Sequence, residues 1–222
     1  MSKLNSRKAL SKIDPRSDKS PHARYQRGSS ESPAKIRAAS PQLDLYHPDF
    51  PGYWDDGIVA VDLDVDLLAK NQALRAAADR VIGAHETGTF SLEDDGIVTA
   101  LNEVNSGCED MNKEVYKQAE KAINDNKLIG LVGGDHSCSY PLISALIDYV
   151  PSFSVLQIDA HMDLRSCYQN FEFSHASVMH NVLKHKDIAR LVQVGVRDYC
   201  AEEAQCVSES KGRVKTYLNQ DI

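Results

Sequence analysis

The sequence predicts an α/β protein in which a mainly parallel β-sheet lies between layers of helices. Three observations support this fold class. Short apolar runs of strand length alternate with segments of helical periodicity along the chain. Polar clusters follow two of these runs directly, which is typical of ligand sites at the carboxyl ends of parallel strands. The composition, with 42% hydrophobic and 26% charged residues, is that of an ordinary globular protein.

Length and composition exclude several other classes of protein. A chain of 222 residues has room for one domain with a tail. Its composition excludes collagen-like, coiled-coil and wholly disordered chains. No run approaches the roughly 18 apolar residues of a membrane span, so we expect no membrane partner. Five cysteines without a dense pattern indicate reduced thiols and a cytoplasmic location.

Residues 1–40 differ from the rest of the chain in charge. They hold ten Lys and Arg against three acidic residues, and they are rich in Ser. We interpret them as a disordered basic tail, because they cannot bury enough apolar surface to fold. A mitochondrial transit peptide and a segment that contacts an acidic surface are the alternatives. The remaining domain, residues 41–222, is strongly acidic, which argues against a nucleic-acid partner.

The first half of this domain is predicted to be mainly helical. Residues 41–57 are dense in Pro, Gly, Asp and aromatic residues, so we expect an ordered loop there. Residues 58–61 predict a short strand. Apolar residues at helical spacing predict helices over residues 66–82 and 110–124.

The second half is predicted to alternate strands and helices. Each predicted strand is a short apolar run bounded by turn residues. The strands span 127–132, 153–158, 191–196 and 214–218, and the helices span 139–149 and 177–185. This order predicts the parallel sheet and places the polar clusters at one edge of it.

Three polar clusters contain the candidate functional residues. They are Gly-Gly-Asp-His-Ser at 133–137, Asp-Ala-His-Met-Asp at 159–163 and Ser-His-Ala-Ser at 174–177. The paired glycines allow a tight turn before the helix that follows. His175 in the third cluster is a plausible proton carrier, because imidazole titrates near neutral pH. A surface or capping histidine is the alternative.

The first two clusters have the spacing of a metal site. Asp159, His161 and Asp163 alternate along the chain, so an extended backbone would place them on one face. His136 follows the preceding predicted strand and can supply a fourth ligand. Carboxylates with imidazoles suit Mn²⁺, Zn²⁺ or Fe²⁺, and the absence of a thiolate favours Mn²⁺. The alternative for Asp-x-His-x-Asp alone is a hydrogen-bonded strand end.

These motifs resemble those of the ureohydrolase family, which contains arginases, agmatinases and formimidoylglutamases. The similarity lies in Val-GGDHS-Cys at 132–138, Gln-Ile-DAHMDLR-Ser at 157–166 and the SHAS segment, and it extends over about residues 103–199. The resemblance implies a three-layer α/β/α fold and a two-manganese centre. It also implies hydrolysis of a C–N bond in a linear guanidine or amidine, with release of urea.

The resemblance further implies a role for each matching residue. His136 and Asp163 would bind the first manganese ion, and His161 would bind the second. Asp159 would bridge both ions. His175 matches the catalytic histidine, which helps to move protons to the leaving amine.

One family motif, Ser-x-Asp-x-Asp-x-x-Asp-Pro, is not found between residues 195 and 222. The resemblance therefore implies an incomplete second metal site and a partial, C-terminally truncated domain. Asp62, Asp64 and Asp66 look superficially similar, but we interpret them as acids near a helix start. The alternative function is a catalytically inactive or partner-dependent relative that lacks this motif.

The expected substrate is a small guanidine or amidine, with agmatine or arginine as the first choice. Arg165 could pair with a substrate carboxylate, which would favour formimidoylglutamate or another acidic substrate. It could equally form a structural ion pair with an acid such as Asp198. We also expect a homo-oligomer.

Overall fold

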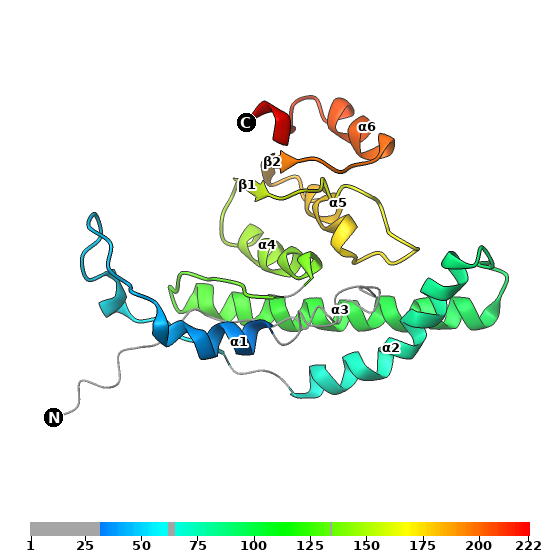
Figure 1. Ribbon diagram of the computed structural model, residues 1–222, viewed down its shortest axis with the longest axis horizontal. Helices are drawn as coiled ribbons and strands as arrows, with labels where there is room; N and C mark the ends of the chain where they lie inside the picture. The colour runs from blue at the N-terminus through cyan, green and yellow to red at the C-terminus, as the bar shows by residue number, and fades with distance from the viewer. Residues whose placement is uncertain (1–31, 62–64, 134) are drawn as a thin grey trace.

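A computed structural model describes residues 32–61, 65–133 and 135–222 of the chain (Figure 1). The α-helices are α1 (Ser32–Ala39), α2 (Val65–Glu86), α3 (Asp95–Asn124), α4 (Ser139–Ile147), α5 (Val178–Leu183) and α6 (Ala201–Glu209). The strands are β1 (Phe153–Ile158), β2 (Ile188–Val196) and β3 (Val214–Leu218). Short 3₁₀ turns occur at η2 (Ser40–Gln42), η3 (Tyr53–Asp56), η4 (His136–Cys138), η5 (His175–Ser177) and η6 (Asn219–Asp221). The alternation of strands and helices after residue 138 confirms the α/β class.

The three strands form a parallel sheet in the order β1-β2-β3. The predicted strands over 153–158, 191–196 and 214–218 are confirmed, and β2 begins three residues earlier than expected. Helix α5 lies between β1 and β2 in the chain, and α6 lies between β2 and β3. One face of the sheet packs with α4, α5 and α6 into an apolar cluster that includes Leu191, Val196 and Val214. This packing fixes the carboxyl ends of β1 and β2, from which the candidate site is built.

Helices α2 and α3 pack side by side below α4 (Figure 1). Both predicted helices exist, but α3 begins 15 residues earlier than expected, at Asp95. Asp94 caps it, because its carboxylate accepts hydrogen bonds from the backbone N–H groups of Gly96 and Ile97 at 2.8 and 3.2 Å. Small residues line the α2–α3 contact, and Phe171 is fully buried against it. Small side chains allow the two helices to approach closely.

The expected strands at 127–132 and 58–61 are wrong, because neither segment is a strand in the structure. In the first segment, Ile129 and Leu131 pack against the cluster between α3 and α4, whereas Leu128 is 96% exposed. An apolar run alone does not reveal whether its partner is a strand or a helix. Here the described partners of these side chains are helical.

The second face of the sheet carries large apolar side chains that are open to solvent. Leu156 on β1 is 63% exposed and Ile158 is 79% exposed. Tyr217 on β3 is 38% exposed on the same face, because it is the register partner of Val194, which pairs with Ile158.

The basic tail is only partly within the described residues. Residues 1–31 lie outside them, so the expected boundary near residue 40 stays a prediction. Residues 32–39, which were expected to be disordered, form α1 with Pro33 buried near its start. In the part of the chain that the structure describes, no helix combines the length and the apolar character that crossing a bilayer requires.

Candidate metal centre

The first polar cluster forms the turn that leads into α4. Asp135 caps the short turn η4, and its buried carboxylate accepts a hydrogen bond from the Ser137 N–H at 2.8 Å. This turn places His136 beyond the N-terminal end of α4. The expected tight turn at Gly133 and Gly134 includes a residue, Gly134, that lies outside the described residues.

The second cluster forms the loop at the carboxyl end of β1. Asp159 closes an Asx turn, since its carboxylate accepts a hydrogen bond from the His161 N–H at 2.9 Å. The loop is not extended throughout, contrary to expectation, because Asp163 has a φ of 55°. The Asp163 carbonyl accepts hydrogen bonds from the N–H groups of Met179 and His180 at 3.0 and 3.2 Å, which attaches the loop to α5.

His136, Asp159 and Asp163 converge on one point. One potential ligand atom from each residue lies within 4.8 Å of the other two. His136 Nδ1 is 2.7 Å from Asp163 Oδ2 and 3.4 Å from Asp159 Oδ2. Asp163 is buried, and the other two side chains are partly buried. Three of the four expected metal ligands are therefore together, although His136 and Asp163 are separated by 27 residues in the chain.

The charges of this cluster act strongly on His136. Burial disfavours the charged imidazole, but the hydrogen bond and charge of Asp163, with the charges of Asp159 and Asp135, outweigh that effect. The pKa of His136 is therefore raised above its ordinary value. The carboxylates that attract a proton to this imidazole would equally attract a metal cation.

His161, the fourth expected ligand, lies at the border of the cluster. Its Nδ1 is 3.3 Å from Asp159 Oδ1, and its side chain is 57% exposed. Its Nε2 is 3.8 Å from Asp198 Oδ2. From the sequence, we consider Asp198 as a partner of Arg165 and not as a neighbour of His161. The signal was present, because Asp198 follows β2, whose carboxyl end adjoins that of β1.

His175 lies on η5, which packs against η4. A capping box forms this turn, in which Ser174 Oγ accepts a hydrogen bond from the Ala176 N–H at 3.0 Å and Ser177 Oγ accepts one from the Ser174 N–H at 2.9 Å. His175 Nδ1 is 3.5 Å from Asp135 Oδ2. Burial opposes the charged form of His175, but the hydrogen bond and charge of Asp135 raise its pKa overall. His175 and His136 thus flank Asp135 on two adjoining turns.

Arg165 lies beside a buried acid of α6. Its Nε is 3.9 Å from Glu203 Oε2, and its guanidinium is 5.7 Å from the centre of the Tyr168 ring. Glu203 also accepts hydrogen bonds from the backbone N–H groups of Leu164 and Cys200 at 3.0 and 2.9 Å. The structural ion pair weighed from the sequence is therefore the arrangement found, with Glu203 as the partner.

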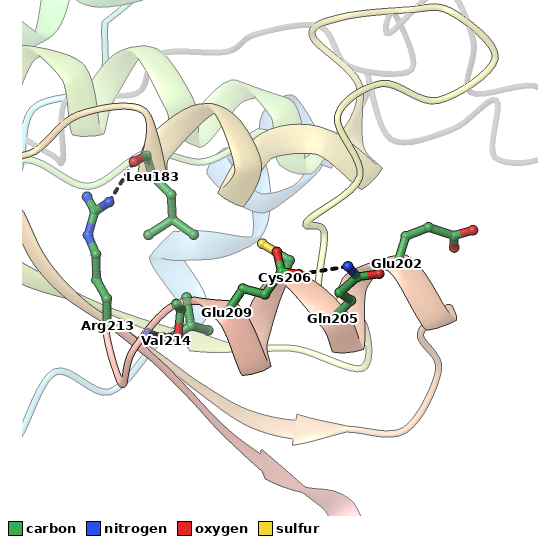
Figure 2. A pocket seen from close by; sticks show the side chains of 8 residues that line it. Leu183, Glu202, Gln205, Cys206, Glu209, Arg213 and Val214 are labelled. Atoms are coloured by element: carbon green, nitrogen blue, oxygen red, sulfur yellow. Dashed lines mark hydrogen bonds between the residues drawn. The ribbon is translucent and has the colours of Figure 1, made fainter.

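The described residues also form a pocket of about 410 Å³, lined by residues of α5, α6 and β3 (Figure 2). None of its lining residues belongs to the His136 cluster. The Arg213 guanidinium at its edge donates hydrogen bonds to the backbone carbonyls of Leu183 at 2.8 Å, Ile188 at 3.0 Å and His185. That cation therefore serves to cap the end of α5.

The donor set of the cluster fits a hard or borderline cation. It offers carboxylate oxygens and one imidazole, with a second imidazole adjoining, and no thiolate. Carboxylates with imidazoles are ligands that suit Mn²⁺. Structural zinc sites, by contrast, are commonly built from cysteines.

Comparison with known proteins relates these motifs to a family. The family model described as the arginase family matches residues 18–222. An N(1)-aminopropylagmatine ureohydrolase of Thermus thermophilus is 36% identical over 90 residues, which cover 40% of this chain and 30% of that protein. An agmatinase of Pyrococcus horikoshii is 27% identical over 186 residues, which cover 84% of this chain and 51% of that protein. The matched segments thus span between about a third and a half of these relatives.

Solved structures show the same fold at low sequence identity. The arginase from Medicago truncatula matches with a TM-score of 0.61 and 18% identity, over 96% of this chain and 56% of that one. Formimidoylglutamase from Bacillus subtilis matches with a TM-score of 0.60 and 16% identity, over 100% of this chain and 57% of that one. These matches confirm the three-layer α/β/α fold class that the sequence predicts. With the family model covering nearly the whole chain, the protein belongs to the arginase family.

Proposed function

We propose that the protein is a manganese-dependent hydrolase that cleaves a C–N bond of a linear guanidine, with release of urea, or of a linear amidine, with release of an amide. The observation that carries the proposal is the convergence of His136, Asp159 and Asp163 at the carboxyl end of β1. Membership of the arginase family supports the reaction class.

Different residues at the site would bind each of the two cations. His136 and Asp163 would bind the first ion, His161 would bind the second, and Asp159 would contribute to both. Manganese bound there would supply a nucleophile from water at neutral pH and stabilise the charge that develops on the substrate. The acidic cluster would also orient a cationic guanidinium group before reaction.

His175 would act as the proton carrier. Its Nδ1 faces Asp135, which leaves Nε2 as the atom that exchanges a proton. Because Asp135 raises the pKa of His175, the imidazole keeps its proton to a higher pH than an ordinary histidine does. A protonated Nε2 can donate to the amine as it leaves, which avoids the release of a strongly basic anion.

A linear guanidine is the substrate class that we favour, with agmatine or arginine as the first probes. The names of the matched relatives, an N(1)-aminopropylagmatine ureohydrolase and an agmatinase, support a guanidine substrate. Formimidoylglutamate would need a free cation for its carboxylates, and Arg165 already lies beside Glu203. A homo-oligomeric assembly stays a prediction.

A second candidate is a family relative that binds one metal ion and does not hydrolyse a substrate. The observation that favours it is the position of His161, whose side chain is 57% exposed and outside the three-residue cluster. A single site formed by His136, Asp159 and Asp163 would then be the whole metal centre.

The test is a Mn²⁺ titration with a count of bound metal, followed by assays of urea release from agmatine and arginine. Two bound ions and urea release are expected. His136→Ala should abolish high-affinity binding, whereas Asp187→Asn, which neutralises an exposed acid outside the cluster, should not. One bound ion without urea would replace the hydrolase with the second candidate, and no bound metal would reject both.

A further inference from the structure

Three polar side chains lie in one row across the sheet, directly behind the Asp159–Asp163 loop. Gln157 on β1 is the register partner of Gln193 on β2, and Gln193 is the partner of Thr216 on β3. Gln157 is 4% exposed and Gln193 is fully buried. The inward face of a sheet normally carries apolar side chains, because burying an amide without partners costs roughly 1–3 kcal/mol in proteins. These two amides therefore need a complete set of hydrogen bonds.

The hydrogen bonds of this row run in one direction. Thr216 Oγ1 donates to Gln193 Oε1 at 2.8 Å, and Gln193 Nε2 donates to Gln157 Oε1 at 2.7 Å. Since its oxygen is thereby engaged, Gln157 presents its Nε2 group to the loop. That group donates to Asp163 Oδ2 at 3.2 Å. A reversed amide would instead place an oxygen against the carboxylate, so the row permits one orientation.

The same two amides also hold the backbone of the loop. Gln157 Nε2 lies 3.3 Å from the His161 carbonyl, and Gln193 Nε2 donates to the Met162 carbonyl at 2.7 Å. The next residue, Asp163, has a φ of 55°, a conformation that non-glycine residues seldom adopt. Such a conformation persists only where its surroundings hold it. The row therefore contacts both the backbone and the carboxylate of this segment.

We propose that Gln157, Gln193 and Thr216 form a positioning relay that orients the Asp163 carboxylate before any metal binds. The three potential ligands of the cluster are His136, Asp159 and Asp163, and the relay sets the geometry of one of them. A fixed carboxylate needs less reorganisation to bind a cation, so the relay also sets metal affinity. The effect on metal affinity rests on the proposed function, whereas the orientation of the Asp163 carboxylate concerns the metal-free protein.

The first experiment uses NMR on the metal-free chain. Thr216→Val removes the hydroxyl at nearly constant volume, and Thr216→Ser keeps it. Ser154→Ala, which removes a hydroxyl from the exposed face of β1, is the matched control. Thr216→Val should speed solvent exchange of the Gln157 and Gln193 side-chain amides and shift the carboxyl ¹³C signal of Asp163. Thr216→Ser and Ser154→Ala should leave these signals unchanged. Unchanged signals in Thr216→Val would overturn the relay.

The second experiment measures Mn²⁺ affinity from the electron paramagnetic resonance signal of free Mn²⁺. Gln157→Leu should weaken binding by about 10- to 100-fold, the usual effect of losing a partner of a metal ligand. Thr216→Val should weaken it less, and Thr216→Ser should restore wild-type affinity. Wild-type affinity in folded Gln157→Leu and Thr216→Val would refute the relay and leave the metal site intact. If Thr216→Val changes the NMR signals as expected but the wild-type chain binds no Mn²⁺, the proposed function fails and the relay is upheld.

Discussion

Four polar contacts hold Asp163 in place. Its carboxylate contacts His136 Nδ1 at 2.7 Å and Gln157 Nε2 at 3.2 Å, and its carbonyl accepts two N–H groups of α5. A positive φ at a non-glycine residue costs of order 1–3 kcal/mol, which these contacts must offset. The role of Asp163 follows from the Asp-x-His-x-Asp spacing, but its backbone conformation does not. That conformation depends on α5 and the neighbouring strands, which no local pattern encodes.

Asp135 should control the pH dependence of the metal-free protein through His175. The raised pKa of His175 means that the ion pair stabilises the fold fully below the ordinary histidine pKa of about 6.5. This stabilisation is lost as the pH rises through the raised pKa. In Asp135→Asn, only the charge of Asp163 still opposes the effect of burial on His175, so the pKa of His175 should fall, while the remaining oxygen can still cap η4.

The measurement is the melting temperature of the metal-free wild-type and Asp135→Asn chains between pH 5.5 and 9. The deficit of the variant should be largest at the acidic end and should shrink towards the alkaline end. Asp187→Asn supplies the control for a lost negative charge at an exposed position. A deficit that does not change with pH would show that Asp135 acts through its cap rather than through His175.

The five free cysteines should differ sharply in reactivity. Cys167 is exposed, whereas burial raises the pKa of Cys108 to about 12. A chromogenic thiol reagent should therefore label Cys167 first, and Cys108 only when the protein unfolds. Cys167→Ser should remove the fastest phase and leave the slow ones unchanged. Rapid labelling of Cys108 in the native protein would contradict the α2–α3 packing described above.

At the scale of elements, the cap of α3 should be a measurable source of stability. Asp94→Ala removes the acceptor for two N–H groups at the helix start, which should cost about 1 kcal/mol of the free energy of unfolding. Asp94→Asn keeps an oxygen in place and should recover most of this loss. Urea denaturation followed by circular dichroism measures both values. Equal stability of Asp94→Ala and wild type would mean that tertiary packing alone fixes the helix start.

Elements were predictable where their own residues determine them. The three strands of the sheet and the second half of α3 follow from apolar periodicity. The first half of α3 was missed although Ile97, Leu101 and Val104 are buried there at helical spacing. The run at 127–132 has the composition of a strand, but Ile129 and Leu131 pack on helices and Leu128 is exposed. Composition records that a segment is apolar, and only the tertiary fold decides what covers it.

The candidate site was predictable to a similar extent. The structure brings His136 of the first cluster to Asp159 and Asp163 of the second, although the segment before the first cluster is not a strand. The relay of Gln157, Gln193 and Thr216 was not foreseen, since it depends on the register of three strands. The pairing of Arg165 with Glu203 joins residues 38 positions apart, which no spacing rule predicts.

At the scale of the whole molecule, metal binding should stabilise the fold. The ligands come from two segments that meet only in the folded chain, so Mn²⁺ should bind the native state in preference to the unfolded one. At a concentration 100 times Kd, such binding adds about 2.7 kcal/mol. Calorimetry should show a melting temperature that rises with Mn²⁺ and returns to the metal-free value with a chelator. A similar rise in His136→Ala would place the stabilising ion elsewhere.

The exposed face of the sheet, with Leu156 and Ile158, should affect the solubility of the protein. Solubility then depends on a balance between charge repulsion and apolar attraction between copies of the chain. The formal net charge of −7 keeps copies of the chain apart, and this repulsion weakens as added salt screens it. The apolar faces of two copies attract each other by the hydrophobic effect, and this attraction strengthens with warming and with sulfate or phosphate. Salting-out should therefore begin at lower ammonium sulfate when the solution is warm than when it is cold. A cloud-point curve of this shape would indicate that the exposed side chains of Leu156 and Ile158 contribute to association of the chain.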